Sequence, residues 1–233
     1  MALSNSQYDA IMREYGKRQM ENQHSQEARK KEVYEKVPAV KELEAEIAER
    51  SVACARKLLE GSQVVVIDTN LPAESIAWLA DNCHAPIFAD PVSTVKAEKL
   101  RPVLGKLHTL KPNRLEAELL SGVPITGTDS LHRAAQTLLE TGLHRVFISL
   151  GADGVYAADQ SGSVTLPAPK AEMVSTTGCG DSFMAALTWA YLQGSDLERS
   201  ARAGLAASSL TMESAETIHP SMSEAELLRR MAL

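Results

Sequence analysis

Residues 64–90 read VVVIDTNLPAESIAWLADNCHAPIFAD, and this stretch sets the fold class of the chain. VVVID (Val64–Asp68) is a β-branched run typical of a strand that is buried on both faces. Residues 72–82 predict a helix with Pro72 in its first turn, and PIFAD (Pro86–Asp90) predicts the next strand. A strand, a helix and a second strand in this order are typical of parallel pairing.

The same alternation continues toward the C-terminus. Further strands are predicted at His108–Pro112, Arg145–Leu150 and Gly154–Asp159, with a polar loop and SVTLPAP after them. Further helices are predicted in a stretch ending near Leu104 and at 114–122, 129–142, 180–193, 196–212 and 223–231. The pattern indicates an α/β protein with a doubly wound, mostly parallel sheet and helices on both faces.

Residues 1–61 have a different composition and predict a charged α-helical segment interrupted at Pro38. Apolar residues are sparse there, so such helices need a partner surface to be stable. We therefore divide the chain into this helical segment and an α/β domain at residues 62–233.

The composition excludes several classes of protein. The chain has 233 residues and a net charge of −6, which argues against a general nucleic-acid binder. No apolar run is long enough to span a bilayer, and the polar N-terminus lacks the core of a secretory signal. Three scattered cysteines indicate neither a disulfide framework nor a zinc site. We expect a cytoplasmic protein with no membrane and no nucleic-acid partner.

The strongest local signal is STTGCGDSFMAAL (Ser175–Leu187). Gly178, Cys179 and Gly180 precede an apolar helix, where backbone N–H groups and the helix dipole favour an anion. Asp181 lies in the first turn of this helix. It is either an ordinary N-terminal helix residue or a general base beside an anion hole, and the spacing leaves both open.

Two further motifs are ambiguous when taken alone. Asn113 and Glu116 lie in HTLKPNRLEAELLSG, where the spacing fits a capping box as well as a site at the carboxyl end of a strand. Gly151 and Gly154 lie in SLGADGVY, which suits a hairpin or the close approach of a nucleotide.

Together and in this order, the three motifs resemble the C-terminal portion of the ribokinase (PfkB) family of small-molecule kinases. TGCGDSF is similar to the family's TGAGD-F signature, KPNRLEAE to its N-x-x-E motif, and SLGADGV to its nucleotide-loop strand pair. The resemblance covers about residues 62–233, and residues 90–122 are similar to the pseudouridine kinases of the family. It implies a ribokinase-like fold and an ATP-dependent sugar or nucleoside kinase, with the 5′-hydroxyl of pseudouridine as the expected acceptor.

The resemblance also implies a role for each matching residue. Asp181 would be the catalytic base, and Gly178, Cys179 and Gly180 would form the anion hole. Asn113 and Glu116 would organise Mg²⁺ and the ATP phosphates, Glu116 acting on the metal through water. The residues expected to contact ATP are Ser149, Gly151 and Gly154, with Ala207 and Ser208 near the adenine, and Asp90 is expected on the substrate side of the crevice. ATP, Mg²⁺ and a monovalent cation are the implied cofactors.

The sequence departs from the family pattern at two places. Cys179 replaces the usual alanine of the anion hole; the backbone N–H is kept, and a thiol at a helix N-terminus is expected to be unusually acidic. The family's N-terminal strands, di-glycine motif and β lid have no counterpart in residues 1–60, which resemble instead the N-terminus of DnaC-type helicase loaders.

An alternative reading is therefore a truncated, catalytically silent nucleotide-binding domain whose N-terminal helices serve association. The first strand would be left as an apolar edge, which predicts self-association into a homo-oligomer.

Overall fold

A computed structural model describes Lys17, Glu21, His24, Ser25, Ala28, Arg56 and residues 58–232. The helical segment predicted at residues 1–61 lies, apart from those positions, outside the described residues. In the part of the chain that is described, no helix is both long and apolar enough to span a bilayer.

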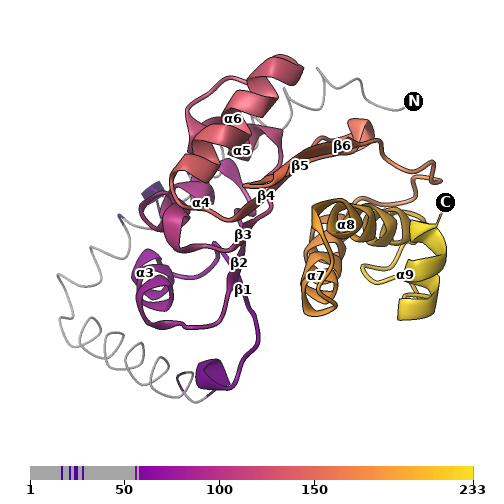
Figure 1. Cartoon of the computed structure of the whole chain (residues 1–233), viewed down its shortest axis with the longest axis horizontal. Coiled ribbons are helices and arrows are strands. Elements are labelled where there is room, and N and C mark those ends of the chain that lie inside the picture. The colour runs from indigo at the N-terminus through magenta and orange to yellow at the C-terminus, as the bar shows by residue number, and fades with distance from the viewer. Residues whose placement is uncertain are drawn as a thin grey trace.

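Six strands form one sheet in the sequential order β1-β2-β3-β4-β5-β6 (Figure 1). The strands are β1 (Val65–Asp68), β2 (Ile87–Asp90), β3 (Thr109–Leu110), β4 (Arg145–Ser149), β5 (Val155–Asp159) and β6 (Gly162–Leu166). The first four are mutually parallel, and β5 and β6 are added as antiparallel hairpins. The predicted α/β class with a mostly parallel sheet is therefore confirmed.

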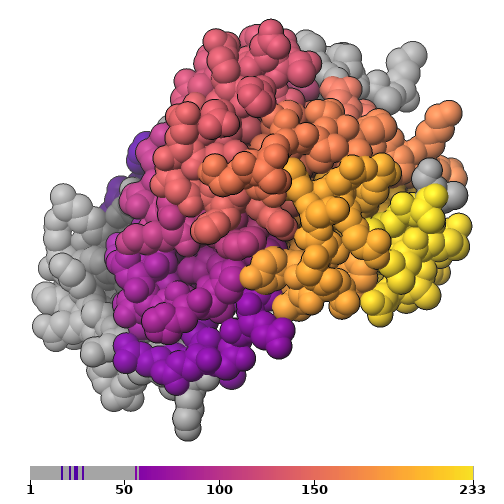
Figure 2. Space-filling view, in the orientation of Figure 1, coloured from indigo at the N-terminus to yellow at the C-terminus, as the bar shows by residue number. Residues whose placement is uncertain are grey.

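Helices cover both faces of this sheet, as predicted (Figure 1). One face carries α3 (Ala73–Asn82), α4 (Thr94–Ala97), the 3-10 helix η1 (Glu98–Lys106), α5 (Arg114–Ser121) and α6 (Thr128–Glu140). The other carries α7 (Cys179–Leu192) and α8 (Leu197–Met212), with α9 (Glu224–Met231) packed on α8. Figure 2 shows these C-terminal helices, orange to yellow, in one continuous body with the sheet and the earlier helices.

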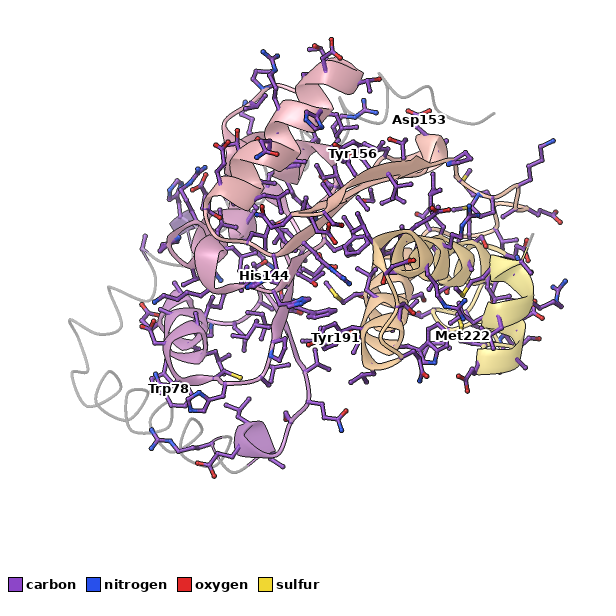
Figure 3. All side chains as sticks on the ribbon, in the orientation of Figure 1. Trp78, His144, Asp153, Tyr156, Tyr191 and Met222 are labelled. Carbon is purple, nitrogen blue, oxygen red and sulfur yellow. The ribbon has the colours of Figure 1, made fainter. Side chains whose placement is uncertain are left out.

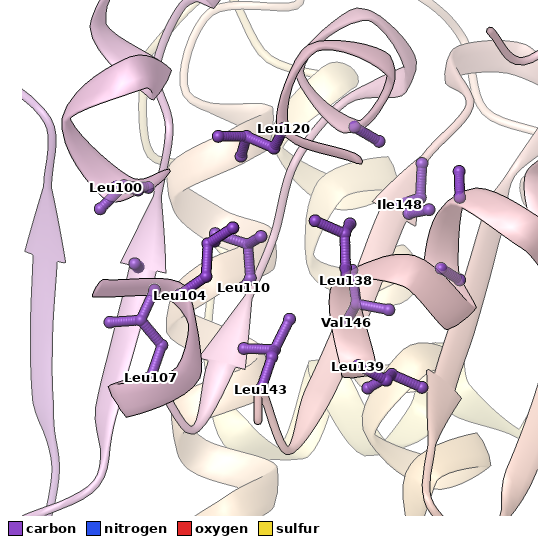
Figure 4. Packing of buried hydrophobic residues seen from close by; sticks show 14 of the residues in the cluster. Leu100, Leu104, Leu107, Leu110, Leu120, Leu138, Leu139, Leu143, Val146 and Ile148 are labelled. Carbon is purple, nitrogen blue, oxygen red and sulfur yellow. The ribbon is translucent and has the colours of Figure 1, made fainter. Parts of the chain in front are cut away.

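The alternation of side chains along each strand divides the core between the two faces. Val146 and Ile148 point into the cluster beneath α5 and α6, together with Leu138 (Figure 4). Phe147, between them in β4, packs with Phe183 of α7 on the opposite face. Because helices cover both faces, successive residues of β4 from Val146 to Ile148 are all buried, and such continuous apolar runs are the reason that the strands could be located from the sequence.

Three details differ from the sequence-based expectation. The helix predicted to end near Leu104 is α-helical over only one turn and continues as η1, which contains Pro102; proline has no N–H to continue an α-helical ladder. The strand predicted at 108–112 is reduced to the two residues of β3. SVTLPAP supplies most of a strand, β6, because its SVTL portion pairs with β5.

The expectation that Val64–Asp68 is buried on both faces is wrong. Val66 is 49% exposed, whereas Ile67 is buried. The physical reason is position: β1 lies at the edge of the sheet within the described residues, and it pairs there with β2 alone.

A column of rings joins the sheet to α7 at the amino ends of the strands. Phe88 and His108 are stacked with their centroids 5.3 Å apart, and His144 stacks on His108 at the same separation. The ring of Tyr191 in α7 lies edge-on to this column, with its centroid 4.8 Å from that of His108. Figure 3 labels His144 beside the sheet and Tyr191 at α7. Burial, followed by the charges of His144 and Arg145, lowers the pKa of His108 to about 4.

Candidate active site

The first turn of α7 is exposed and begins at a glycine that no other residue can replace easily. Gly178 has a left-handed conformation (φ 83°), and a Cβ there would lie 2.6 Å from the carbonyl oxygen of Thr217. No side chain among the described residues caps this helix. The N–H groups of the first turn therefore lack a side-chain partner, which is the arrangement that an anion needs.

Asp181 lies in the same turn, and it is exposed together with Gly180. Its carboxylate is thus accessible to a ligand that reaches the turn, as a general base must be. The structure leaves both readings of Asp181 open, so its catalytic role stays a prediction.

The sheet meets this turn through an ion pair. The Nζ atom of Lys111 lies 2.9 Å from Oδ2 of Asp90, and both side chains are largely buried. A Cβ on Gly180 would lie 3.5 Å from that Nζ and 4.0 Å from that Oδ2. The carboxyl end of β2 and the residue after β3 are therefore adjacent to the N-terminus of α7, although roughly 70 to 90 residues of sequence separate them from it.

Lys111 is a residue that sequence reasoning missed. Its only signal was a lysine directly after an apolar strand and two residues before Asn113. Such a lysine is ordinarily solvated, but here the residue is 6% exposed.

Asp90 also orders the loop that follows β2. Its Oδ1 accepts the backbone N–H of Val92 at 3.0 Å. Val92 has φ 62°, an uncommon conformation for a β-branched residue, and its side chain is 44% exposed. Strained backbone of this kind collects at functional sites, and here it adjoins the ion pair.

Asn113 and Glu116 form a complete capping box at the start of α5. The side chain of Asn113 accepts the N–H of Glu116 at 3.0 Å, and Oε2 of Glu116 accepts the N–H of Asn113 at 2.8 Å. Burial raises the pKa of Glu116 to about 7, while the N–H of Asn113 and the charge of Lys111 act in the opposite direction. The capping interpretation of this spacing is confirmed, and the proposed contact with Mg²⁺ and ATP remains a prediction.

Ser149 lies beside this capping box, whereas the two glycines of SLGADGVY differ in their surroundings. The N–H of Ser149 donates to the carbonyl of Pro112 at 2.9 Å, which brings the end of β4 next to Asn113. Gly151 is exposed at the start of the short turn η2 (Gly151–Asp153). Gly154 is buried, and a Cβ there would lie 2.0 Å from the carbonyl oxygen of Leu166. Packing against the end of β6 is thus sufficient reason for Gly154.

Ser208 and Ala207 are adjacent on α8 but have different neighbours. The hydroxyl of Ser208 donates to the carbonyl of Cys179 at 2.8 Å and so supports the start of α7. Ala207 is buried among the alanines that join α7 to α8, in a cluster that Leu227 of α9 completes. Contact of either residue with adenine stays a prediction.

The expectation of an acidic Cys179 thiol is wrong. Burial raises the pKa of this thiol, and the sulfur lies 3.6 Å from the carbonyl oxygen of Ser208. Partial burial disfavours the charged thiolate because it removes water from the sulfur.

No three His, Cys, Asp or Glu side chains among the described residues are grouped closely enough to hold a metal ion. Glu116 is 2% exposed and its Oε2 is engaged by a backbone N–H. The Oε2 atom of Glu116 is thus already engaged, and the expected role of Glu116 toward Mg²⁺, through water, stays a prediction.

The N-terminus of α7 lies beside the carboxyl ends of the parallel strands, which is where open α/β sheets bind their ligands. The sequence profile of the pfkB family carbohydrate kinases matches residues 23–225, and the chain belongs to that family. It is 38% identical to pseudouridine kinase of Escherichia coli over 174 residues, which are 74% of this chain and 56% of that protein. It is 35% identical to ribokinase of Staphylococcus aureus over 161 residues, covering 68% of this chain and 53% of that enzyme.

Solved structures show the same fold. A proposed sugar kinase from Clostridium perfringens matches with a TM-score of 0.74 and 34% identity, over 78% of this chain and 58% of that one. Arabidopsis thaliana ribokinase, solved with ribose and ATP, matches with a TM-score of 0.67 and 24% identity, over 76% of this chain and 58% of that one. The fold is ribokinase-like, as expected, and the chain spans about half the length of the curated relatives that it matches.

Proposed function

We propose that this chain provides the nucleotide-binding and base-bearing part of an ATP-dependent kinase that phosphorylates the 5′-hydroxyl of pseudouridine. The observation that carries the proposal is the exposed first turn of α7, with Asp181 in it, adjacent to the buried Lys111–Asp90 pair. An anion-binding turn beside an accessible carboxylate is the arrangement that phosphoryl transfer to a hydroxyl requires.

In this proposal Asp181 accepts the proton of the acceptor hydroxyl. At the same time the oxygen of that hydroxyl forms a bond to the γ-phosphorus of ATP. The bond between that phosphorus and the β–γ bridging oxygen breaks, and ADP leaves with its electron pair. The amides at Gly178–Gly180 stabilise the charge of the transferring phosphoryl group. Mg²⁺ would neutralise part of the phosphate charge, and Asn113 and Glu116 would orient its water ligands.

Pseudouridine is preferred as the acceptor because of the 38% identity to the Escherichia coli pseudouridine kinase. A monovalent cation is carried over from the family resemblance as part of the same proposal. The family includes kinases with other acceptors, such as ribokinase, so the acceptor has to be tested against alternatives.

The test is to incubate the purified chain with MgATP and with pseudouridine, uridine or ribose, and to detect the monophosphate by mass spectrometry. We expect pseudouridine 5′-phosphate as the main product. The matched control is the Asp181→Asn variant, which should not form this product. Preferential phosphorylation of ribose would contradict the choice of acceptor.

A second candidate function is nucleotide binding without phosphoryl transfer, with association through the N-terminal residues. The observation that favours it is that Asp181 lies in the first turn of α7, where an acidic residue also serves the helix dipole without any catalytic role. Calorimetric binding of ATP together with no product from any acceptor would favour this candidate over the first.

A further inference from the structure

An ion pair that none of the roles assigned above uses joins the helix α9 to the end of α8. The guanidinium of Arg230 donates to Oε2 of Glu213 at 2.6 Å and to Oε1 of Glu226 at 3.1 Å. The side chains of Arg230 and Glu213 are 17% and 25% exposed, so the pair is better shielded from water than an ordinary surface pair. Glu213 is the first residue after α8. The pair therefore fixes the end of α8 to α9, which lies beside it in yellow in Figure 1.

Glu213 is also in contact with the loop that leads into α7. The hydrogen bond from Arg230 holds the pKa of Glu213 below its ordinary value, although partial burial opposes this. The charge of His219 and the backbone N–H of Glu172 act in the same direction as Arg230. The carboxylate is thus held by groups from three segments: α9, the loop after α8 and the loop before α7.

The loop before α7 is fixed to the same end of α8 through its backbone. The N–H groups of Val174 and Ser175 donate to the carbonyl of Met212, at 2.9 and 3.1 Å. Met212 is the last residue of α8 and directly precedes Glu213. Ser175 lies three residues before Gly178, where the first turn of α7 begins. The position of the end of α8 therefore sets how the chain enters that turn.

The loop after α8 packs against the same turn. A Cβ on Gly178 would lie 2.6 Å from the carbonyl oxygen of Thr217 and 2.8 Å from its Cγ2 atom. Thr217 lies four residues after Glu213. Both loops that flank the first turn of α7 are therefore fixed at the end of α8 that Arg230 holds.

We propose that Arg230 and Glu213 are positioning residues, which hold the loops at 172–178 and 214–219 in the arrangement that lets the first turn of α7 bind a nucleotide phosphate. They act on the turn through Met212 and Thr217, and neither side chain contacts the nucleotide. The inference rests on the proposed function, since this turn is the one assigned there to the phosphates.

The test compares Arg230→Met with Arg229→Met in the full chain. Arg229 is the neighbouring arginine of α9, but its side chain is 60% exposed and its hydrogen bonds within the described residues go to Glu226. In Arg230→Met we expect the affinity for ATP, measured by calorimetry, to fall roughly threefold to thirtyfold, within the range for residues coupled in one salt-bridge network. Arg229→Met should bind ATP as the wild type does. Arg230→Lys keeps a charge beside Glu213 and should retain most of the affinity.

Hydrogen exchange separates positioning of the turn from a general loss of stability. In Arg230→Met the amides of residues 172–181 should exchange faster than in the wild type, and those of β4 and β5 should be unchanged. Because this variant leaves the carboxylate of Glu213 unpaired, the double variant Arg230→Met/Glu213→Gln replaces it if it does not fold. Glu213→Gln alone should also weaken ATP binding. The double variant should lose no more affinity than the weaker of the two single variants, because the same pair is broken in each.

The outcomes are distinct. Wild-type affinity for ATP in folded Arg230→Met, or in the folded double variant that replaces it, would overturn the inference and leave the proposed function intact. An equal loss of affinity in Arg229→Met, or exchange that is accelerated equally in β4 and β5, would also overturn it, because the pair would then be only structural. A wild-type chain that does not bind ATP would overturn the proposed function, and this inference with it.

Discussion

Asp181 is the residue whose substitution should separate chemistry from binding. Its carboxylate is exposed in the first turn of α7 and makes no cap within the described part of the chain, so Asp181→Asn removes charge without removing a contact seen there. We expect turnover to fall by about 10²–10⁴, the usual contribution of a general base, with ATP affinity nearly unchanged. Steady-state kinetics together with calorimetric titration of ATP measure both quantities.

The matched control for Asp181 is Asp196→Asn, at the start of α8, where the carboxylate accepts the N–H of Arg199 at 2.8 Å. It is a helix-terminal aspartate with a capping role that an asparagine oxygen retains, so its substitution should leave both stability and turnover close to wild type. Parallel losses of ATP affinity and turnover in Asp181→Asn would show that Asp181 is structural.

At the scale of single residues, the sequence predicted the candidate site residues that lie within one continuous motif. It missed the contacts between residues that are distant in sequence and are brought together by the fold. Gly178–Asp181 and Asn113–Glu116 each form one local unit, so their spacing was sufficient to locate them. The pairing of Lys111 with Asp90 depends on the register of β2 and β3, which no local pattern contains. The acidity of Cys179 was misjudged because the burial of its sulfur involves the distant helix α8, whose Ser208 carbonyl oxygen lies 3.6 Å away.

At the scale of elements, the cap of α5 can be separated from the predicted nucleotide contact of Asn113. Asn113→Ala removes the acceptor for the N–H of Glu116 and should lower the free energy of unfolding by about 1 kcal/mol. Asn113→Asp keeps the cap, so its stability should remain close to wild type while its added charge weakens ATP binding. Urea unfolding and ATP titration are the two measurements; a stable Asn113→Ala would contradict the capping contribution.

The ring column between the sheet and α7 predicts a pH dependence of stability. Burial lowers the pKa of His108 to about 4, whereas an imidazole in the unfolded chain titrates near 6.5. Between these values the unfolded state binds more protons, so this histidine makes stability fall as pH falls from about 6.5 to about 4. Glu116 acts oppositely: with its pKa raised to about 7, its contribution is full below about 4.5 and is lost as pH rises through 7.

Because the two groups oppose each other, the His108 contribution is measured by difference. His108→Phe retains a ring against Phe88 and Tyr191 and cannot titrate. We expect its free energy of unfolding, relative to wild type, to be higher at pH 5 than at pH 7.5, which means greater relative stability at the lower pH. His132→Phe is the control, since His132 lies on α6 outside the column, and the same pH-dependent gain in both variants would contradict the assignment.

The fold could be predicted at the scale of elements because the strands are short apolar runs and the helices carry clear glycine and proline boundaries. Val155–Asp159 and the helices after residue 178 lie within one or two residues of their predicted limits. The predictions that failed concern elements whose structure depends on other residues. Pro102 changes the hydrogen bonding of the helical stretch near Leu104, and β6 is a strand because β5 is available to pair with it.

At the scale of the whole molecule, the position of β1 predicts association. β1 is an edge strand within the described residues, and Val66 on it is 49% exposed. Exposed apolar edges pair with other chains unless they are covered, and a lysine on the edge is a common protection against this. We therefore expect the wild-type chain to self-associate with increasing concentration, and Val66→Lys to shift it toward the monomer.

Leu228→Lys is the control, because Leu228 is 40% exposed but lies on α9, away from the sheet edge. Light scattering over a concentration series measures the effect. A wild-type chain that stays monomeric throughout, or an equal shift in both variants, would show that β1 is not the associating edge.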